Sequence, residues 1–236
     1  MNLLQIFAQV GEGMGNSILI FVLTLLFSLP LGLLVAFGRM NRWAPLAALK
    51  KNRSPLLQKL AGFRPVQLIF KLFISILRGT PLMLQLMVVY YGPYYIFKVP
   101  ITLGYQFYAV IIAFAVNYAA YFAEIYRSGI ESMPVGQYEA AKVLGYSKAE
   151  TFFRIILPQV VKRVIPAVGN EVITLVKDTS LAFTIAVAEM FTIAKQLSSA
   201  NTTMVPLIAA GVFYYVFNFI VAWTMERIEK RLSYYE

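Results

Sequence analysis

Polar and ionisable side chains recur at helical spacing inside one of the most apolar stretches of this sequence. Asn117, Tyr121 and Glu124 stand at positions i, i+4 and i+7, which places all three on one face of a helix. A charge near the middle of a membrane costs about 2.5–3.5 kcal/mol, so it normally faces a partner or a water-filled cavity. This face is therefore a candidate wall for the path of a polar solute. Hydrogen bonding between helices is the structural alternative.

A second set of such residues lies further along the chain, where Glu171, Thr174 and Asp178 share a helical face in the same way. Glu171 precedes Asp178 by seven residues, which is about 10.5 Å along a helix axis. The structural alternative for Asp178 is an ion pair with the neighbouring Lys177. The two faces together predict anionic groups at membrane depth.

The sequence RGTP at residues 78–81 places a cation beside two residues that break helices. Glycine and proline free backbone groups there, and broken helices at membrane depth often line binding sites. The alternative is a simple kink from which the Arg78 side chain extends to the membrane surface. We treat this break as a candidate site for an anionic group of the solute.

Together these residues could bind a free amino acid, which needs an anion for its α-ammonium group and a cation for its carboxylate. Asp178 and Arg78 supply that pair of charges. Hydroxyl groups that could complete the contacts belong to Thr80, Thr179 and Ser180. Glu171 is then left to face the substrate side chain, which predicts a preference for basic amino acids because an unpaired buried carboxylate is costly.

Several kinds of chemistry are excluded because the chain has no Cys and no His. Disulfides, thiolate or imidazole metal ligands, and Ser-His or Cys-His nucleophile pairs are all absent. No phosphate-binding glycine loop or zinc-protease motif occurs either. A membrane-embedded enzyme that uses only the carboxylates of Glu124 or Asp178 remains as an alternative to transport.

The elements that must position these residues are membrane-spanning helices. Hydrophobic residues make up 59% of the chain, and the mean hydropathy is +0.68. A spanning helix needs about 20 mostly apolar residues. Five segments qualify as candidates: 13–38, 79–97, 99–123, 196–225 and, interrupted by charges, 164–194. Since hydrocarbon cannot satisfy open backbone groups, we expect an all-α integral membrane protein with about five spans.

The net charge of +10 is distributed in alternate loops, which indicates a membrane orientation rather than nucleic-acid binding. Eight basic residues fall within 39–71, six within 127–163 and three within 227–231. The intervening loops hold only Lys98 and Lys195. This positive-inside pattern predicts an external N-terminus and a cytoplasmic C-terminus.

A short polar stretch, YEAAKVLGYSKAETFFRIILPQ at residues 138–159, falls in one of the predicted cytoplasmic loops. Residues 139–144 favour a helix that Gly145 ends, and Ser147 with Glu150 forms a capping box that starts a second helix. We expect that second helix to end at Pro158. Ala140 and Ala141 are small enough to enter a groove of another protein. The alternative is an amphipathic loop on the membrane surface.

Four segments, in order, resemble the permease subunits of ABC importers of the polar amino acid uptake family. They are RGTPLMLQL at 78–86, N-x-x-x-Y-x-x-E-x-x-R at 117–127, the EAA motif from Glu139 through Gly145 to I-x-L-P at 155–158, and GNEVITLVKDTSLA at 169–182. The resemblance covers about residues 77–195. The long basic loop at 42–64 departs from it, and its role is unknown.

The resemblance implies a single permease domain over residues 1–236 with the fold of a type I ABC importer, in the bacterial cytoplasmic membrane. It implies partners: cytoplasmic ATP-binding subunits that hold ATP and Mg, a second permease copy or paralogue, and an extracytoplasmic amino acid-binding protein. This chain itself would be neither an enzyme nor the holder of a cofactor.

Within residues 134–158, the resemblance makes the EAA segment the helix that couples ATPase closure to translocation. Its residues are Glu139, Ala140, Ala141 and Gly145. An ATP-independent secondary transporter or channel for amino acids is the other reading of the spans and buried charges.

Overall fold

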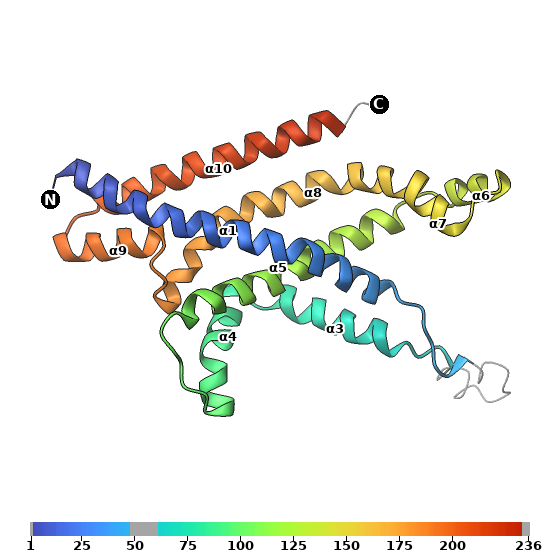
Figure 1. The fold of residues 1–236 in the computed structure, drawn as a ribbon, viewed down its shortest axis with the longest axis horizontal. Coiled ribbons are helices and arrows are strands. Elements are labelled where there is room, and N and C mark those ends of the chain that lie inside the picture. Colours follow the sequence, from blue (N-terminus) through green and yellow to red (C-terminus); the bar gives the residue numbers. More distant parts are fainter. Residues whose placement is uncertain (1, 48–60, 233–236) are drawn as a thin grey trace.

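The structure, a computed structural model, describes residues 2–47 and 61–232. Over these ranges the chain forms helices and no strand, as predicted (Figure 1). The elements in order are α1 (Leu3–Met40), α3 (Pro65–Gly79), α4 (Leu82–Phe97), α5 (Tyr105–Glu131), α6 (Val135–Val143), α7 (Lys148–Glu150), the π-helical η2 (Thr151–Ile156), α8 (Leu157–Asp178), the 3₁₀-helical η3 (Thr179–Ile185), α9 (Met190–Asn201) and α10 (Val205–Leu232).

Three of these helices are long and apolar enough to cross a membrane: α1, α5 and α10. The pair α3 and α4 adds a fourth span if it is counted as one, although its members are bent by 109°. The fifth predicted span corresponds to α8, η3 and α9. None of these meets the same criterion, because η3 and α9 are too short and charged residues interrupt α8. The predicted count of five spans is therefore not confirmed.

The helix breaks at residues 78–81, as the glycine and proline there predicted. Gly79 is the last residue of α3, Thr80 is extended, and Pro81 caps the start of α4. Pro81 has no N–H to continue the preceding helix, and its ring disfavours a helical conformation at Thr80. Figure 1 shows α4 turning away from the other long helices at this point.

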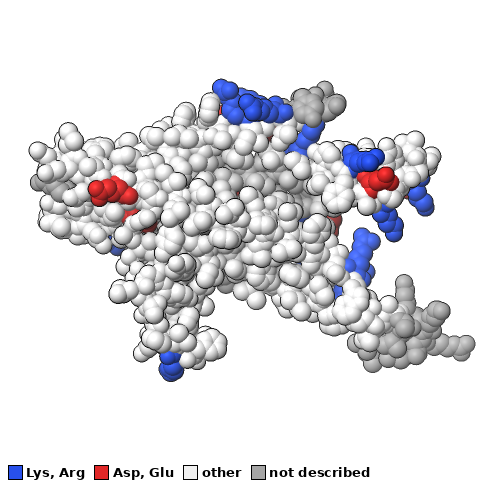
Figure 2. All heavy atoms as spheres, viewed as in Figure 1, with Lys and Arg blue, Asp and Glu red and all other residues white. Residues whose placement is uncertain are grey.

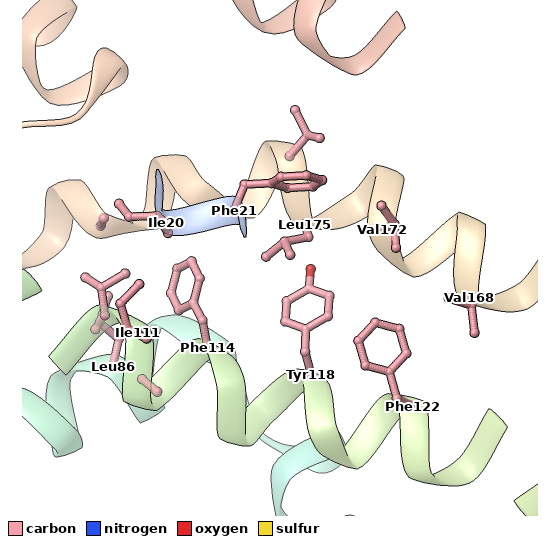
Figure 3. Packing of buried hydrophobic residues seen from close by; sticks show 14 of the residues in the cluster. Ile20, Phe21, Leu86, Ile111, Phe114, Tyr118, Phe122, Val168, Val172 and Leu175 are labelled. Atoms are coloured by element: carbon pink, nitrogen blue, oxygen red, sulfur yellow. The ribbon is translucent and has the colours of Figure 1, made fainter. Parts of the chain in front are cut away.

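Helix α5 contacts α1, α3, α4 and α8, and Figure 3 shows its side chains directed toward α1 and α8. Small residues bring α1 close to it: a Cβ atom on Gly32 would lie 2.8 Å from the Cβ atom of Phe122. Helix α5 also directs Phe114 and Tyr118 toward a group that includes Ile20 of α1 and Leu175 of α8 (Figure 3). The candidate site residues of α5, which are Asn117, Tyr121 and Glu124, therefore project from a well-packed helix.

The surface between the two ends of the bundle is largely uncharged, and Lys, Arg, Asp and Glu gather near the margins (Figure 2). Large apolar side chains are exposed along the long helices, including Leu34 at 66% and Tyr215 at 72%. Soluble proteins do not leave so much apolar helix surface uncovered. This surface is suited to the hydrocarbon of a membrane.

Candidate functional site

A pocket of about 320 Å³ opens between the end of α3, the C-terminal half of α5 and the middle of α8. Its charged lining residues are Arg78, Glu124, Arg163 and Glu171. The guanidinium group of Arg78 lies 5.2 Å from the centre of the Tyr121 ring, which also lines the pocket. Three predicted site residues, Arg78, Glu124 and Glu171, thus come together around one cavity that holds charges of both signs.

Glu124 is not an isolated carboxylate, because Arg127 binds it one turn further along α5. The Nε atom of Arg127 donates to Glu124 at 3.1 Å, and a second guanidinium nitrogen pairs with the other carboxylate oxygen. Arg127 also pairs with Glu131. Glu124 therefore offers a partly neutralised acceptor to the pocket. Glu171, in contrast, forms no ion pair with another residue that the structure describes.

The helix break is held by a hydrogen-bonded clamp that includes Asn117. The amide of Asn117, 4% exposed, donates to the Gln85 side chain at 2.9 Å and to the Leu77 carbonyl at 3.2 Å. Gln85 donates in turn to the hydroxyl of Thr80 at 2.8 Å, and Thr80 donates to the carbonyl of Ile76 at 2.8 Å. Asn117 and Thr80 are thus engaged in fixing the bend beside Arg78. Gln85 was missed, although it is the one polar side chain in the LMLQL run.

Asp178 lies at the end of α8 and does not line the pocket. Its carboxylate accepts a 2.7 Å hydrogen bond from the hydroxyl of Tyr118, a residue that sequence reasoning did not single out. The predicted pairing of Asp178 with Arg78 around one substrate is therefore not supported by the geometry. The alternative ion pair is not formed either, because no salt bridge joins Asp178 to Lys177 among the residues that the structure describes.

The remaining hydroxyl groups predicted for the site bond to the backbone of their own helices. Thr174 donates to the Asn170 carbonyl at 2.9 Å, and Ser180 donates to the Lys177 carbonyl at 2.7 Å. Thr179 is fully buried and donates to Val176 at 2.8 Å. None of the three lines the pocket. Thr179 and Ser180 stabilise the passage from α8 into η3, because each supplies a donor to a carbonyl near the end of α8.

Glu189 forms a separate, fully buried node at the opposite end of the bundle. Its two carboxylate oxygens accept hydrogen bonds from backbone N–H groups of Phe191 and Thr192, at 2.8 and 2.6 Å, which caps α9. Tyr214 of α10 donates to the same carboxylate at 2.8 Å, and Ser17 of α1 does so at 3.4 Å. In the sequence, Glu189 is one of the charged residues that interrupt the apolar segment 164–194. The capping position before α9 was the signal for its role.

The EAA segment forms α6 and ends as predicted at Gly145, whose φ is +81°. The N–H of Gly145 donates to Lys142 at 3.1 Å, and the N–H of Tyr146 donates to Ala141 at 3.0 Å. These two bonds satisfy carbonyl groups at the end of the helix, in the pattern that a left-handed residue allows. A Cβ atom on Gly145 would meet nothing within 4 Å. A side chain at this position is therefore disfavoured by the positive φ of the backbone and not by a lack of space.

Only part of the EAA motif is exposed for contact with another protein. Glu139 and Ala140 are exposed, but Ala141 is 1% exposed and packs inside the chain. The prediction that both alanines form an external knob is therefore wrong for Ala141. A pocket of about 620 Å³ opens beside this helix and is lined by Tyr138, Lys142, Tyr146, Ser147, Lys148, Thr151 and Phe152.

The capping box after Gly145 is present. Ser147 accepts from the Glu150 N–H at 3.2 Å, and Glu150 accepts from the Ser147 N–H at 3.0 Å. The prediction that this helix ends at Pro158 is wrong, because the helix continues into α8. The π-helical segment η2 accounts for the difference: the N–H of Leu157 reaches back five residues to Phe152, and the proline follows within the first turn of α8.

Comparison with known protein families finds a match over residues 59–234 to the family described as "Binding-protein-dependent transport system inner membrane component". The L-cystine transport system permease protein TcyB of Bacillus subtilis is 34% identical over 228 residues, covering 96% of this chain and 87% of the relative. The arginine transport system permease protein ArtQ of the same organism is 38% identical over 179 residues, covering 74% and 79% of the two chains.

Solved structures also match over nearly the whole chain. A crystal structure of an amino acid ABC transporter with histidines superposes with a TM-score of 0.80 at 27% identity, covering 98% of this chain and 99% of the other. An inward-facing structure of the MetNI methionine ABC transporter gives a TM-score of 0.64 at 16% identity, covering 96% and 95%. The second of these similarities concerns the fold alone.

Proposed function

Because this chain belongs to the family of binding-protein-dependent transport system inner membrane components and is a permease component of the amino acid ABC importer type, we propose that it translocates basic amino acids and that the α6 helix couples this step to ATP hydrolysis. The observation that carries the substrate proposal is the pocket between α3, α5 and α8. Arg78, Glu124 and Glu171 line it together. A zwitterion with a cationic side chain needs one cationic and two anionic contacts, which this set supplies.

Three of the four charged lining residues have separate roles in this proposal, while Arg163 donates to Ser132 in the pocket wall. Arg78 binds the α-carboxylate, since a guanidinium group matches a carboxylate with two parallel donors. Glu124 accepts a hydrogen bond from the α-ammonium group. The electrostatic stabilisation from this contact is partial, because Arg127 already binds the same carboxylate. Glu171 accepts the cationic side chain. The clamp of Asn117, Gln85 and Thr80 then positions Arg78 by fixing the bend next to it.

The preference for a basic substrate rests on Glu171. This carboxylate lines the pocket from α8, is partly buried, and forms no ion pair with another described residue. A cationic side chain would offset the cost of burying it. That one relative is named for arginine agrees with this choice, and the relative named for L-cystine shows that other substrates occur on related chains.

Coupling is proposed to run from α6 to the pocket through the end of α5. Glu139 and Ala140 are exposed on α6 for contact with a cytoplasmic ATPase that holds ATP and Mg. Ser132, which caps α5 directly before α6, also lines the pocket and accepts a 2.9 Å hydrogen bond from Arg163 of α8. A displacement of α6 therefore acts on the pocket wall over a few residues of backbone.

The assembly that this function needs places two permease subunits, identical or paralogous, in a bacterial cytoplasmic membrane. The end that carries α6 faces the cytoplasm, as the positive-inside pattern favours. An extracytoplasmic binding protein delivers the amino acid to the other end.

The test is uptake of radiolabelled arginine into vesicles that contain this chain with its ATPase and binding protein. We expect uptake that requires ATP on the side of the vesicle membrane that the ATPase faces. This uptake should stop when the ATPase is omitted. Equal uptake by this chain alone, without ATP, would instead support the secondary transporter or channel.

A further inference from the structure

One face of α10 is apolar and uncovered over most of its length. Only 22% of the apolar window of this helix is buried inside the chain. Val216, Phe219, Ile220 and Trp223 are 45–60% exposed, and their spacing of three and four residues places them on one side of the helix. These residues lie in the C-terminal half of α10 (Val205–Leu232).

The same face becomes basic in the last two turns of α10. Arg227 and Arg231 follow Trp223 at intervals of four residues, and both are exposed. The Arg227 guanidinium lies 4.6 Å from the centre of the Trp223 ring, which turns the cation toward the aromatic side chain. Neither arginine forms a salt bridge with another described residue, whereas Lys230 pairs with Glu226. Figure 2 shows basic residues gathered at this end of the helix.

From this arrangement we infer that the face Val216–Arg231 of α10 is a binding site for an anionic phospholipid. The acyl chains lie along Val216, Phe219 and Ile220. The phosphate group binds Arg227 and Arg231, because guanidinium groups bind phosphate with paired donors. Trp223 lies between the two parts, at the level where tryptophan is favoured in membranes.

The charge of this chain favours a lipid over a second copy of itself as the occupant. The chain has 21 basic and 11 acidic residues, and basic residues gather at the same end of the molecule. An identical copy would therefore bring more cations to Arg227 and Arg231. An anionic phospholipid supplies both the negative charge and the apolar length that this face lacks. The inference needs α10 to lie in a membrane and does not depend on which substrate is carried.

Fluorescence of Trp223 provides the test, because the chain has only two tryptophans. The full-length Trp43→Phe chain, purified with its partner subunits, is placed in phosphatidylcholine nanodiscs. Phosphatidylglycerol or phosphatidylcholine with brominated acyl chains is then added at equal mole fraction. We expect brominated phosphatidylglycerol to quench Trp223 with an apparent affinity about 25-fold higher, since each of the two arginines near an anionic headgroup contributes about fivefold.

Two variants and one competitor complete the design. Arg227→Gln with Arg231→Gln should remove the preference for phosphatidylglycerol, while Lys230→Gln should retain it because Lys230 is paired with Glu226. Inorganic phosphate at matched ionic strength should leave the quenching unchanged.

Four outcomes would overturn the inference. Equal quenching by both lipids would identify ordinary surrounding lipid, and no quenching by either would show that protein covers Trp223. Displacement by inorganic phosphate would identify a free anion as the ligand. Unchanged preference in the double arginine variant would remove both arginines from the site. Each of these results can be read whether or not the chain transports an amino acid.

Discussion

The phenolic hydroxyl of Tyr118 on α5 donates a 2.7 Å hydrogen bond to the carboxylate of Asp178, the last residue of α8. The two residues are 60 positions apart in the sequence. The Tyr118 side chain is 2% exposed, so the donor has no access to solvent as an alternative partner. This bond joins the end of α8 to the central helix and engages Asp178 in the structure of the bundle.

Removal of the Tyr118 hydroxyl should therefore destabilise the permease. We expect Tyr118→Phe to lower its unfolding free energy by about 1.5–3 kcal/mol, the contribution of a hydrogen bond to a charged group. Thermal unfolding in detergent measures this, with Tyr108→Phe as the control because Tyr108 is 67% exposed. Asp178→Asn keeps an acceptor for Tyr118 and should lose less stability. A complete loss of transport in a stable Asp178→Asn protein would instead indicate that Asp178 contacts the substrate.

Charge neutralisation at Glu171 should separate two substrates. In Glu171→Gln, arginine uptake should fall about tenfold or more, because a hydrogen bond to a charged group contributes about 1.5–3 kcal/mol. Glutamine uptake should hold or rise. Uptake of both amino acids by the reconstituted complex is the measurement, and Glu229→Gln, an exposed change on α10, is the control. An equal loss for both substrates would show that Glu171 does not recognise the side chain of the substrate.

A β-branched residue at position 145 should disturb coupling. The φ of +81° at Gly145 disfavours any side chain, so Gly145→Val should cost on the order of 1 kcal/mol or more at the end of α6. We expect an assembled permease with weaker ATPase binding and little transport. Gly136→Ala is the matched control, since its Cβ atom would also meet nothing within 4 Å and its φ is not positive. Normal ATP-driven uptake by Gly145→Val would argue against coupling at this turn.

The capping box should make the start of α7 sensitive to acid. Hydrogen bonding by the backbone and then the side chain of Ser147 lowers the pKa of Glu150. A lowered pKa means that the favourable contribution is complete above the usual carboxyl pKa and is lost as the pH falls through the lowered value. Amide exchange at Glu150 and Thr151 should thus be slow at neutral pH and accelerate in Ser147→Ala.

The effect of the cap has a matched control. Ser147→Thr should restore slow exchange, because threonine retains the hydroxyl acceptor. If exchange in Ser147→Ala equals that of the unchanged chain, the capping box does not stabilise this segment.

Local features were predictable from the sequence because their partners are a few residues apart. Gly145 and the pair Ser147 and Glu150 involve contacts within four positions, and the break at Pro81 follows from the chemistry of proline. The bonds from Asn117 to Gln85 and from Tyr118 to Asp178 could not be predicted, since they depend on which helices cross and at what height. The α8 continuation past Pro158 was missed because a π-helical turn leaves no mark in residue spacing.

Helix α8 is bounded by two segments in which the backbone hydrogen bonds change their reach. In η2 a donor spans five residues, and in η3 the donors span three. At the far side of η3, the buried Glu189 fastens α9 to α10 and α1. At each end of α8 the backbone therefore departs from the α-helix by one residue in hydrogen-bond reach, lengthened in η2 and shortened in η3. Glu171, which shares the pocket with Arg78, thus projects from the regular α-helical stretch between these two turns.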